Sequence, residues 1–165
     1  MSTLTVDGTI FEIAGLGDVD DPLLRQGIAY WESLRGARAF PAREQLQPRA
    51  IAPLLSRTVL IDIIDGGADF EYVIVGDEVA RAYSARLIHR RISDIAYEMP
   101  NTIAFWDGIY REMCREPKLR VVRMRAGHDG ETHFLDGMVV LLPLGASDSA
   151  IDHIVTFGRR SFIGI

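Results

Sequence analysis

The stretch Arg57–Ala85, RTVLIDIIDGGADFEYVIVGDEVARAYSA, decides the fold of this chain. Its first part, residues 57–64, is rich in β-branched side chains, and Phe70–Val75 is a second run of apolar and aromatic residues. Residues 65–67 between them are Asp-Gly-Gly, which favours a tight turn. The two runs therefore predict a β-hairpin.

Helices and further strands follow this hairpin. Asp77 can cap a short helix over residues 78–84, because its carboxylate can accept backbone N–H bonds that the first helical turn leaves open. Asn101 can cap a longer helix over residues 102–116, which Pro117 ends. Three strand-like runs come last: Leu119–Ala126, Glu131–Pro143 and Ile151–Ile163. This order predicts an α+β fold in which helices cover a five-stranded antiparallel sheet.

Composition narrows the class of protein. The chain has 165 residues, 48% of them hydrophobic, which suits a single domain with a sizeable core. A net charge of −5 argues against a nucleic-acid partner, whose binding face would be basic. Cys114 is the one cysteine, which fits a reducing compartment. The start of the chain has no signal-peptide pattern, and no apolar run reaches the roughly 18 residues of a membrane span. We expect a cytoplasmic protein without a membrane contact.

The part before the hairpin divides in two. Residues 1–19 mix Gly, Thr and Asp, and we expect a flexible arm that orders only if it docks. Residues 20–36 predict a helix that begins at Pro22 and closes at Gly36, and the single domain spans residues 20–165. Several predicted strands are apolar on both faces, so the face away from the internal helices must be covered by this helix, by a partner, or by both.

The motifs from residue 30 onward carry a family resemblance. Residues 30–36 read YWESLRG, residues 40–43 read FPAR, and residues 70–76 read FEYVIVG before the short helix. This combination resembles the stand-alone PAS-domain family of proteobacteria, over about residues 22–163. One departure stands before the Arg-rich stretch, where members have a Gly and this chain has Ile88-His89.

The resemblance implies a PAS fold with strand order 2-1-5-4-3, clasped by short helices, one longer helix and an N-terminal covering helix. Such domains act as sensory or regulatory modules that bind a small ligand, a protein partner or both, and many form homodimers. It also places Arg35, Arg38 and Arg43 in the entry motif. We expect these three to anchor their loop by forked hydrogen bonds to carbonyls or carboxylates, the alternative being solvated charge.

The strand and helix patterns predict where a small apolar ligand could bind. Side chains on one strand face alternate, and those on the longer helix recur at helical spacing, so the two sets should face one another. The candidate cavity lining is Phe70, Tyr72, Ile74, Ile103, Trp106 and Tyr110. A fully packed core is the alternative.

No residue pattern indicates catalysis or a metal site. His89, His128, His133 and His153 lack the spacing of metal ligands. Cys114 lacks the motif of flavin photosensors, and the longer helix carries no histidine for haem. We therefore expect no catalytic and no metal residues, and the sequence names no cofactor. A haem- or flavin-loaded sensor and, further off, a small enzyme on an α+β cage are the alternatives.

The predicted N-terminal helix also suggests an interface. Leu24, Ile28 and Trp31 form one apolar arc, which Leu23 and Tyr30 widen beyond what one neighbour covers. We expect this arc to pack on its own sheet and against a second copy, giving a homodimer with Trp31 as the anchor.

Overall fold

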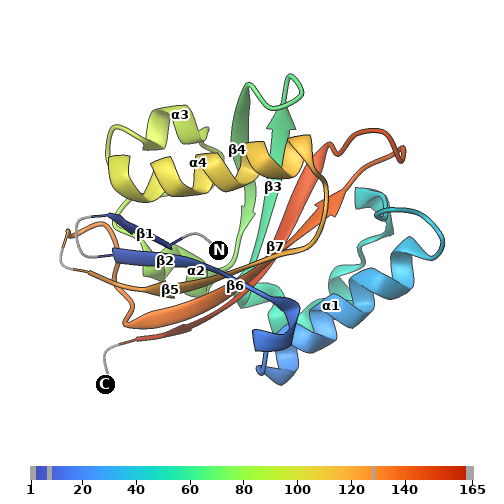
Figure 1. Ribbon diagram of the computed structural model, residues 1–165, viewed down its shortest axis with the longest axis horizontal. Helices are drawn as coiled ribbons and strands as arrows, with labels where there is room; N and C mark the ends of the chain where they lie inside the picture. Colours follow the sequence, from blue (N-terminus) through green and yellow to red (C-terminus); the bar gives the residue numbers. More distant parts are fainter. Residues whose placement is uncertain (1–2, 7–8, 128, 163–165) are drawn as a thin grey trace.

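A seven-stranded sheet forms the centre of the molecule, with its strands in the order β1-β2-β5-β6-β7-β3-β4 (Figure 1). This computed structural model describes residues 3–6, 9–127 and 129–162. All neighbouring strands pair antiparallel. The strands are β1 Thr3–Val6, β2 Thr9–Ala14, β3 Thr58–Ile64, β4 Asp69–Val75, β5 Arg120–Arg125, β6 Asp136–Leu144 and β7 His153–Ser161.

Four α-helices accompany the sheet in the described residues: α1 Pro22–Arg35, α2 Asp77–Ala82, α3 Ile92–Ile95 and α4 Pro100–Arg115. Three 3-10 segments lie before the hairpin: η1 Leu16–Asp18, η2 Arg43–Gln45 and η3 Pro48–Arg57. The α1 start follows the sequence prediction, since the Asp21 carboxylate accepts the N–H groups of Leu23 and Leu24. The chain is therefore α+β, as expected.

The predicted number of strands is wrong, and the order of the whole sheet differs accordingly. When β3 is counted as strand 1, the strands β3 to β7 lie in the predicted order 2-1-5-4-3. Strands β2 and β1 extend the sheet beyond β5. Short strands that pair only after distant parts of the chain have folded give a weak local signal, because each holds few alternating positions.

Part of the arm expected at residues 1–19 docks on the sheet as the same two strands. β2 pairs with β5 from Ile10 opposite Arg125 to Ala14 opposite Val121. Phe11 is fully buried, and its ring stacks on Phe105 of α4 with centroids 4.1 Å apart. Burial of this aromatic side chain explains why the segment docks.

The two faces of the sheet are covered by different helices, with α4 on one and α1 on the other (Figure 1). Leu24, Ile28 and Trp31, expected to reach a second copy, are at most 8% exposed and pack within this chain. The arc is thus narrower than the sequence suggested, because the sheet beneath α1 covers it. Beyond α1 this face carries charged groups, among them the ion pair of Arg159 with Asp136.

A β-bulge changes the expected face of Ile74. Leu60 lies opposite Ile74, whereas the next residue, Ile61, lies opposite Tyr72, so Val73 is the extra residue in β4. An extra residue reverses the side-chain alternation beyond it. Ile74 is consequently 43% exposed on the face away from α4.

Candidate functional site

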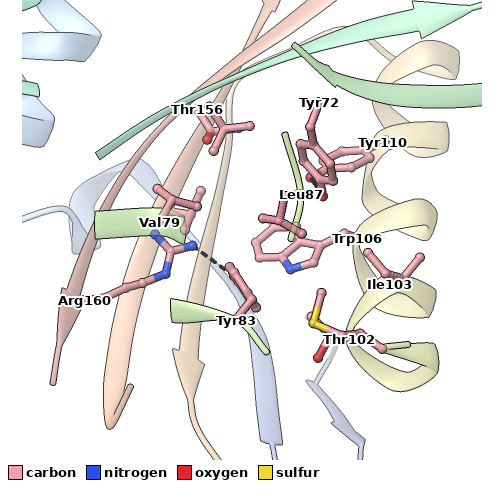
Figure 2. A pocket seen from close by; sticks show the side chains of 13 residues that line it. Tyr72, Val79, Tyr83, Leu87, Thr102, Ile103, Trp106, Tyr110, Thr156 and Arg160 are labelled. Carbon is pink, nitrogen blue, oxygen red and sulfur yellow. Dashed lines mark hydrogen bonds between the residues drawn. The ribbon is translucent and has the colours of Figure 1, made fainter. Parts of the chain in front are cut away.

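A small cavity lies between α4 and the sheet (Figure 2). It has about 20 Å³ of space for the centre of a water molecule, which is enough for one or two waters. The lining is contributed by β3, β4, β6, β7, α2, α4 and the segments between them. It consists of Val59, Tyr72, Val79, Tyr83, Leu87, Met99, Thr102, Ile103, Trp106, Tyr110, Val139, Thr156 and Arg160.

Four of the six side chains predicted to line a cavity do so: Tyr72, Ile103, Trp106 and Tyr110. Phe70 is fully buried beside Tyr110, with ring centroids 5.3 Å apart, but lies behind the lining. Ile74 is the misplaced member, because the bulge turns it to the opposite face. The structure thus combines features of both expectations, since this cavity is small and the core around it is packed.

Two tyrosines meet at one end of the cavity. The hydroxyls of Tyr72 and Tyr110 are 3.0 Å apart and buried, and the Tyr110 ring stacks on Trp106. Burial in the apolar core raises the pKa of both phenols well above the usual value, because the charged form would lose its hydration. Both tyrosines are therefore neutral, and only one of the two protons is used in the bond between them.

An arginine that the sequence analysis missed lies at the other end. Arg160, in β7, is only 9% exposed, and its Nη2 donates to the Tyr83 hydroxyl at 2.9 Å (Figure 2). Its guanidinium carbon lies 5.3 Å from the centre of the Tyr83 ring and 5.7 Å from that of Phe134. These ring faces attract the cation. No described carboxylate forms an ion pair with it, and its Nε has no hydrogen-bond partner among the described residues.

Two glycines make room for this side chain on the sheet. Gly137 lies directly opposite Arg160 in β6, and a Cβ there would lie 3.1 Å from Cγ of Arg160. A Cβ on Gly158 would lie 2.8 Å from Nη1 of Arg160. The only sequence signal for a buried arginine is this pair of strand glycines, whose meaning depends on a strand pairing that the sequence does not show.

The segment after β5 closes the same end of the cavity. Thr132 forms a β-bridge with Tyr83, and the Ala82 carbonyl accepts the N–H of His133. The buried Glu131 carboxylate accepts the N–H of Thr102 at 2.8 Å, so it caps the start of α4. These bonds explain why β6 begins at Asp136 rather than at the predicted Glu131.

The three arginines of the entry motif lie outside the cavity. Arg35 donates to the carbonyl of Arg38 at 2.9 Å, and Arg38 donates to the carbonyl of Gly145 at 2.8 Å. Arg35 also pairs with Glu32, and Arg38 with Asp148. Arg43 makes no side-chain hydrogen bond within the described residues and lines an apolar groove instead. Two of the three thus tie the segment after α1 to the rest of the fold.

The other candidate groups that the structure describes do not line the cavity. His89 and His153 do not line it, His133 lies in the closing segment, and His128 lies outside the described residues. Cys114 is half-buried at the end of α4, and its burial raises the pKa of the thiol. Within the described ranges no three His, Cys, Asp or Glu side chains gather as a metal site would. No helix there has both the length and the apolar character of a membrane span.

Comparison with known proteins identifies the family of this chain. Residues 19–157 match the family described as PAS domain, a range that includes α1, the hairpin, α4 and most of β7. No curated protein and no solved structure gives a match. With most of its length covered by this match, the chain belongs to the PAS domain family.

Proposed function

We propose that the chain is a non-catalytic sensory or regulatory module that binds a small molecule between α4 and the sheet and passes on the signal through contacts with a protein partner. The observation that carries this proposal is the cavity itself, placed inside a PAS domain and lined by both apolar and hydrogen-bonding side chains. Such a lining is typical of small-molecule sites, in which a few polar groups orient the ligand.

The contacts around the cavity support a route from ligand to surface. Met99 and Thr102 line it at the start of α4, where Glu131 caps the helix. Tyr83 lines it and is bridged to Thr132. A ligand that moves either contact would shift the segment around residues 129–133, part of which is exposed. A signal needs such a difference between the bound and free states, and a partner that reads it.

The composition and size of the cavity lining also help to distinguish this proposal from its alternatives, an enzyme and a sensor that holds flavin or haem. Among the described lining residues there is no Asp, Glu, His or Cys to act as a general base or nucleophile, which supports a module without catalysis. Space for one or two waters is far less than a flavin or haem occupies, so the geometry favours a ligand of a few atoms. We further propose a homodimer, on the family resemblance rather than on Leu24, Ile28 and Trp31, which lie inside this chain.

Native mass spectrometry of the freshly purified full chain tests these proposals together. We expect a mass above that of the denatured chain by one small molecule, and a dimeric assembly. In Val79→Phe the added ring fills the cavity, so the extra mass should disappear. Ile74→Phe adds a ring on the opposite face and should keep it. A bound mass that survives Val79→Phe in a folded protein would place the ligand elsewhere, and a monomer at tens of micromolar would remove the dimer.

Amide hydrogen exchange tests the route to the surface. Addition of the molecule identified by mass spectrometry should slow exchange at the start of α4 and in residues 129–133, because ligand contacts reduce local opening. Exchange in α1, on the other face of the sheet, serves as the internal control. Protection confined to the cavity residues would argue against this output segment.

A further inference from the structure

We propose that the cavity is an anion site, and that its ligand is a small carboxylate whose charge is neutralised by Arg160. This inference rests on the proposed ligand-binding function and adds the chemical class of the ligand. A short monocarboxylate is the occupant that the charge, the donors and the size of the cavity favour together.

The first argument is the unbalanced charge. Transfer of a guanidinium out of water is costly unless an opposite charge and hydrogen bonds replace its hydration. Arg160 has one hydrogen bond to a neutral hydroxyl and two aromatic faces, but no carboxylate among the described residues. Its neighbour Arg159, on the other face of the sheet, has the usual arrangement, since it pairs with Asp136. The missing counter-charge of Arg160 is what a bound anion would supply.

The second argument is an excess of hydrogen-bond donors. The Thr102 hydroxyl is buried without a hydrogen-bond partner in the described residues, and the Trp106 indole also lines the cavity. Tyr83 accepts from Arg160, which leaves its own proton to donate. The Tyr72 and Tyr110 pair likewise has one proton left over. No lining carboxylate can use these donors, so a ligand rich in acceptor oxygens complements the site.

The third argument is that donors and charge converge from different elements. Figure 2 shows the Arg160 guanidinium and the Tyr83 hydroxyl on one side of the space, with Trp106 and the tyrosine pair across it. Carboxylates accept from guanidinium groups in short, charge-assisted hydrogen bonds. The glycines at positions 137 and 158 leave room for the arginine side chain on the sheet, and its charged end lines the cavity.

The size of the cavity limits the ligand. About 20 Å³ of space for a water centre suits a carboxylate with few carbons, and Met99 and Leu87 can shift to admit a short apolar tail. Formate, acetate, propionate and butyrate therefore form the probe series. Acetamide is the neutral probe of similar shape to acetate, and chloride tests whether any anion suffices.

The experiment is a titration of the extensively dialysed full chain with each probe at constant ionic strength. Binding is measured by isothermal titration calorimetry and by the change in melting temperature. We expect saturable binding and a rise in melting temperature with acetate or propionate, and neither with acetamide. Trp106 fluorescence should change on binding, because the indole lines the site. Equal responses to acetate and acetamide, or no saturable response to any carboxylate, would overturn the proposal. A response to chloride equal to that of acetate would reduce it to an adventitious ion only.

Variants locate the site. Arg160→Met should weaken carboxylate binding at least about tenfold and melt at or above the wild-type temperature without ligand, because it removes a buried unpaired charge. Arg159→Met makes the same charge change on the other face and should bind as the wild type does. Tyr83→Phe keeps the aromatic ring but removes the hydroxyl, and it should weaken carboxylate binding less than Arg160→Met does. If Arg160→Met does not fold, Tyr83→Phe is the variant that tests the site. Unchanged binding in both Arg160→Met and Tyr83→Phe contradicts the inference.

The outcome separates this inference from the function on which it rests. A neutral molecule found bound by native mass spectrometry leaves the ligand-binding function standing and removes the carboxylate. The absence of any bound mass together with carboxylate titrations that give no response removes both.

Discussion

Trp31 donates its indole N–H to the backbone carbonyl of Pro143, 2.9 Å away, and so ties α1 to β6. The side chain is 4% exposed, and its ring also lies under the guanidinium of Arg35. A residue whose polar and apolar parts are both satisfied inside one chain stabilises the fold of that chain. It has no free surface to offer a second copy.

Substitution of Trp31 should therefore reduce stability and leave the assembly unchanged. Trp31→Phe keeps an aromatic ring but leaves the Pro143 carbonyl without its donor, which should cost about 1–3 kcal/mol of unfolding free energy. Trp31→Ala also leaves a cavity and should cost about 3–5 kcal/mol. Urea unfolding measures both changes. Tyr97→Ala, at a side chain 90% exposed, should change stability by less than about 0.5 kcal/mol.

Light scattering on folded Trp31→Phe provides the second measurement. Its molar mass should equal that of the wild type, whichever assembly the wild type forms. If the wild type is a dimer and Trp31→Phe is a monomer with an unchanged free energy of unfolding, Trp31 lies in the dimer interface.

At Gly27 α1 lies close against the sheet, since a Cβ there would lie 2.5 Å from Cδ2 of Phe157. Gly27→Ala should consequently destabilise the protein by about 1–3 kcal/mol through overpacking. Gly108 lies in α4, is exposed, and has no atom within 4 Å of the equivalent position. Gly108→Ala should stabilise by about 0.5–1 kcal/mol, because alanine loses less backbone entropy on folding. Denaturant unfolding of the pair measures both signs, and a stabilising Gly27→Ala would show that α1 is not packed this closely.

The sequence predicted correctly those helices and strands that depend on residues close together in the chain. The hairpin of β3 and β4 follows from two apolar runs around a turn, and α1 follows from Asp21 and an apolar arc. Tyr72, Trp106 and Tyr110 were placed together because side-chain alternation and helical spacing fix which face each one takes. His89 has a left-handed backbone, with φ of 60°. It lies in the stretch where the sequence departs from the family pattern, with Ile88-His89 in place of a glycine, the residue that adopts this conformation most easily.

Features that depend on distant pairing were not predictable in this way. The bulge at Val73 exists only relative to β3, and it alone moves Ile74 away from the cavity. An arginine in a strand ordinarily indicates an exposed position. Arg160 is buried because glycines of β6 and β7 leave space over the sheet and Tyr83 comes from a segment far away in the sequence. The candidate site was therefore half predictable, in its apolar part and not in its charged part.

The hydrogen bonds of Arg35 and Arg38 give a prediction for the entry motif. Lysine keeps the charge but cannot donate from several nitrogens at once, so Arg38→Lys should lose the bond to Gly145 or that to Asp148. We expect Arg35→Lys and Arg38→Lys each to cost about 0.5–1.5 kcal/mol of unfolding free energy. Arg43→Lys, at an arginine without a side-chain hydrogen bond in the described residues, is the matched control and should have no measurable effect. Thermal unfolding in which none of the three variants differs from the wild type would assign solvated charge to the whole motif.

The tyrosine pair gives a prediction for alkaline pH. An unfolded chain releases a phenolic proton near pH 10, whereas burial keeps the pKa of Tyr72 and Tyr110 above that value in the folded protein. The folded state then binds more protons than the unfolded state, so this contribution to stability is complete below about pH 10 and is lost as the pH rises further. Each tyrosine should lower the unfolding free energy by up to about 1.4 kcal/mol per pH unit in that range.

Urea unfolding from about pH 8 to about pH 12 measures this slope. The double variant Tyr72→Phe/Tyr110→Phe should show a shallower decline than the wild type, because phenylalanine has no proton to lose. Either single variant should lie between them, with an added loss at neutral pH, since the remaining hydroxyl stays buried without its partner. Tyr97→Phe removes the hydroxyl of a side chain that is 90% exposed, and it should follow the wild-type slope. If the double variant loses stability as steeply as the wild type, the alkaline transition arises from groups other than this pair.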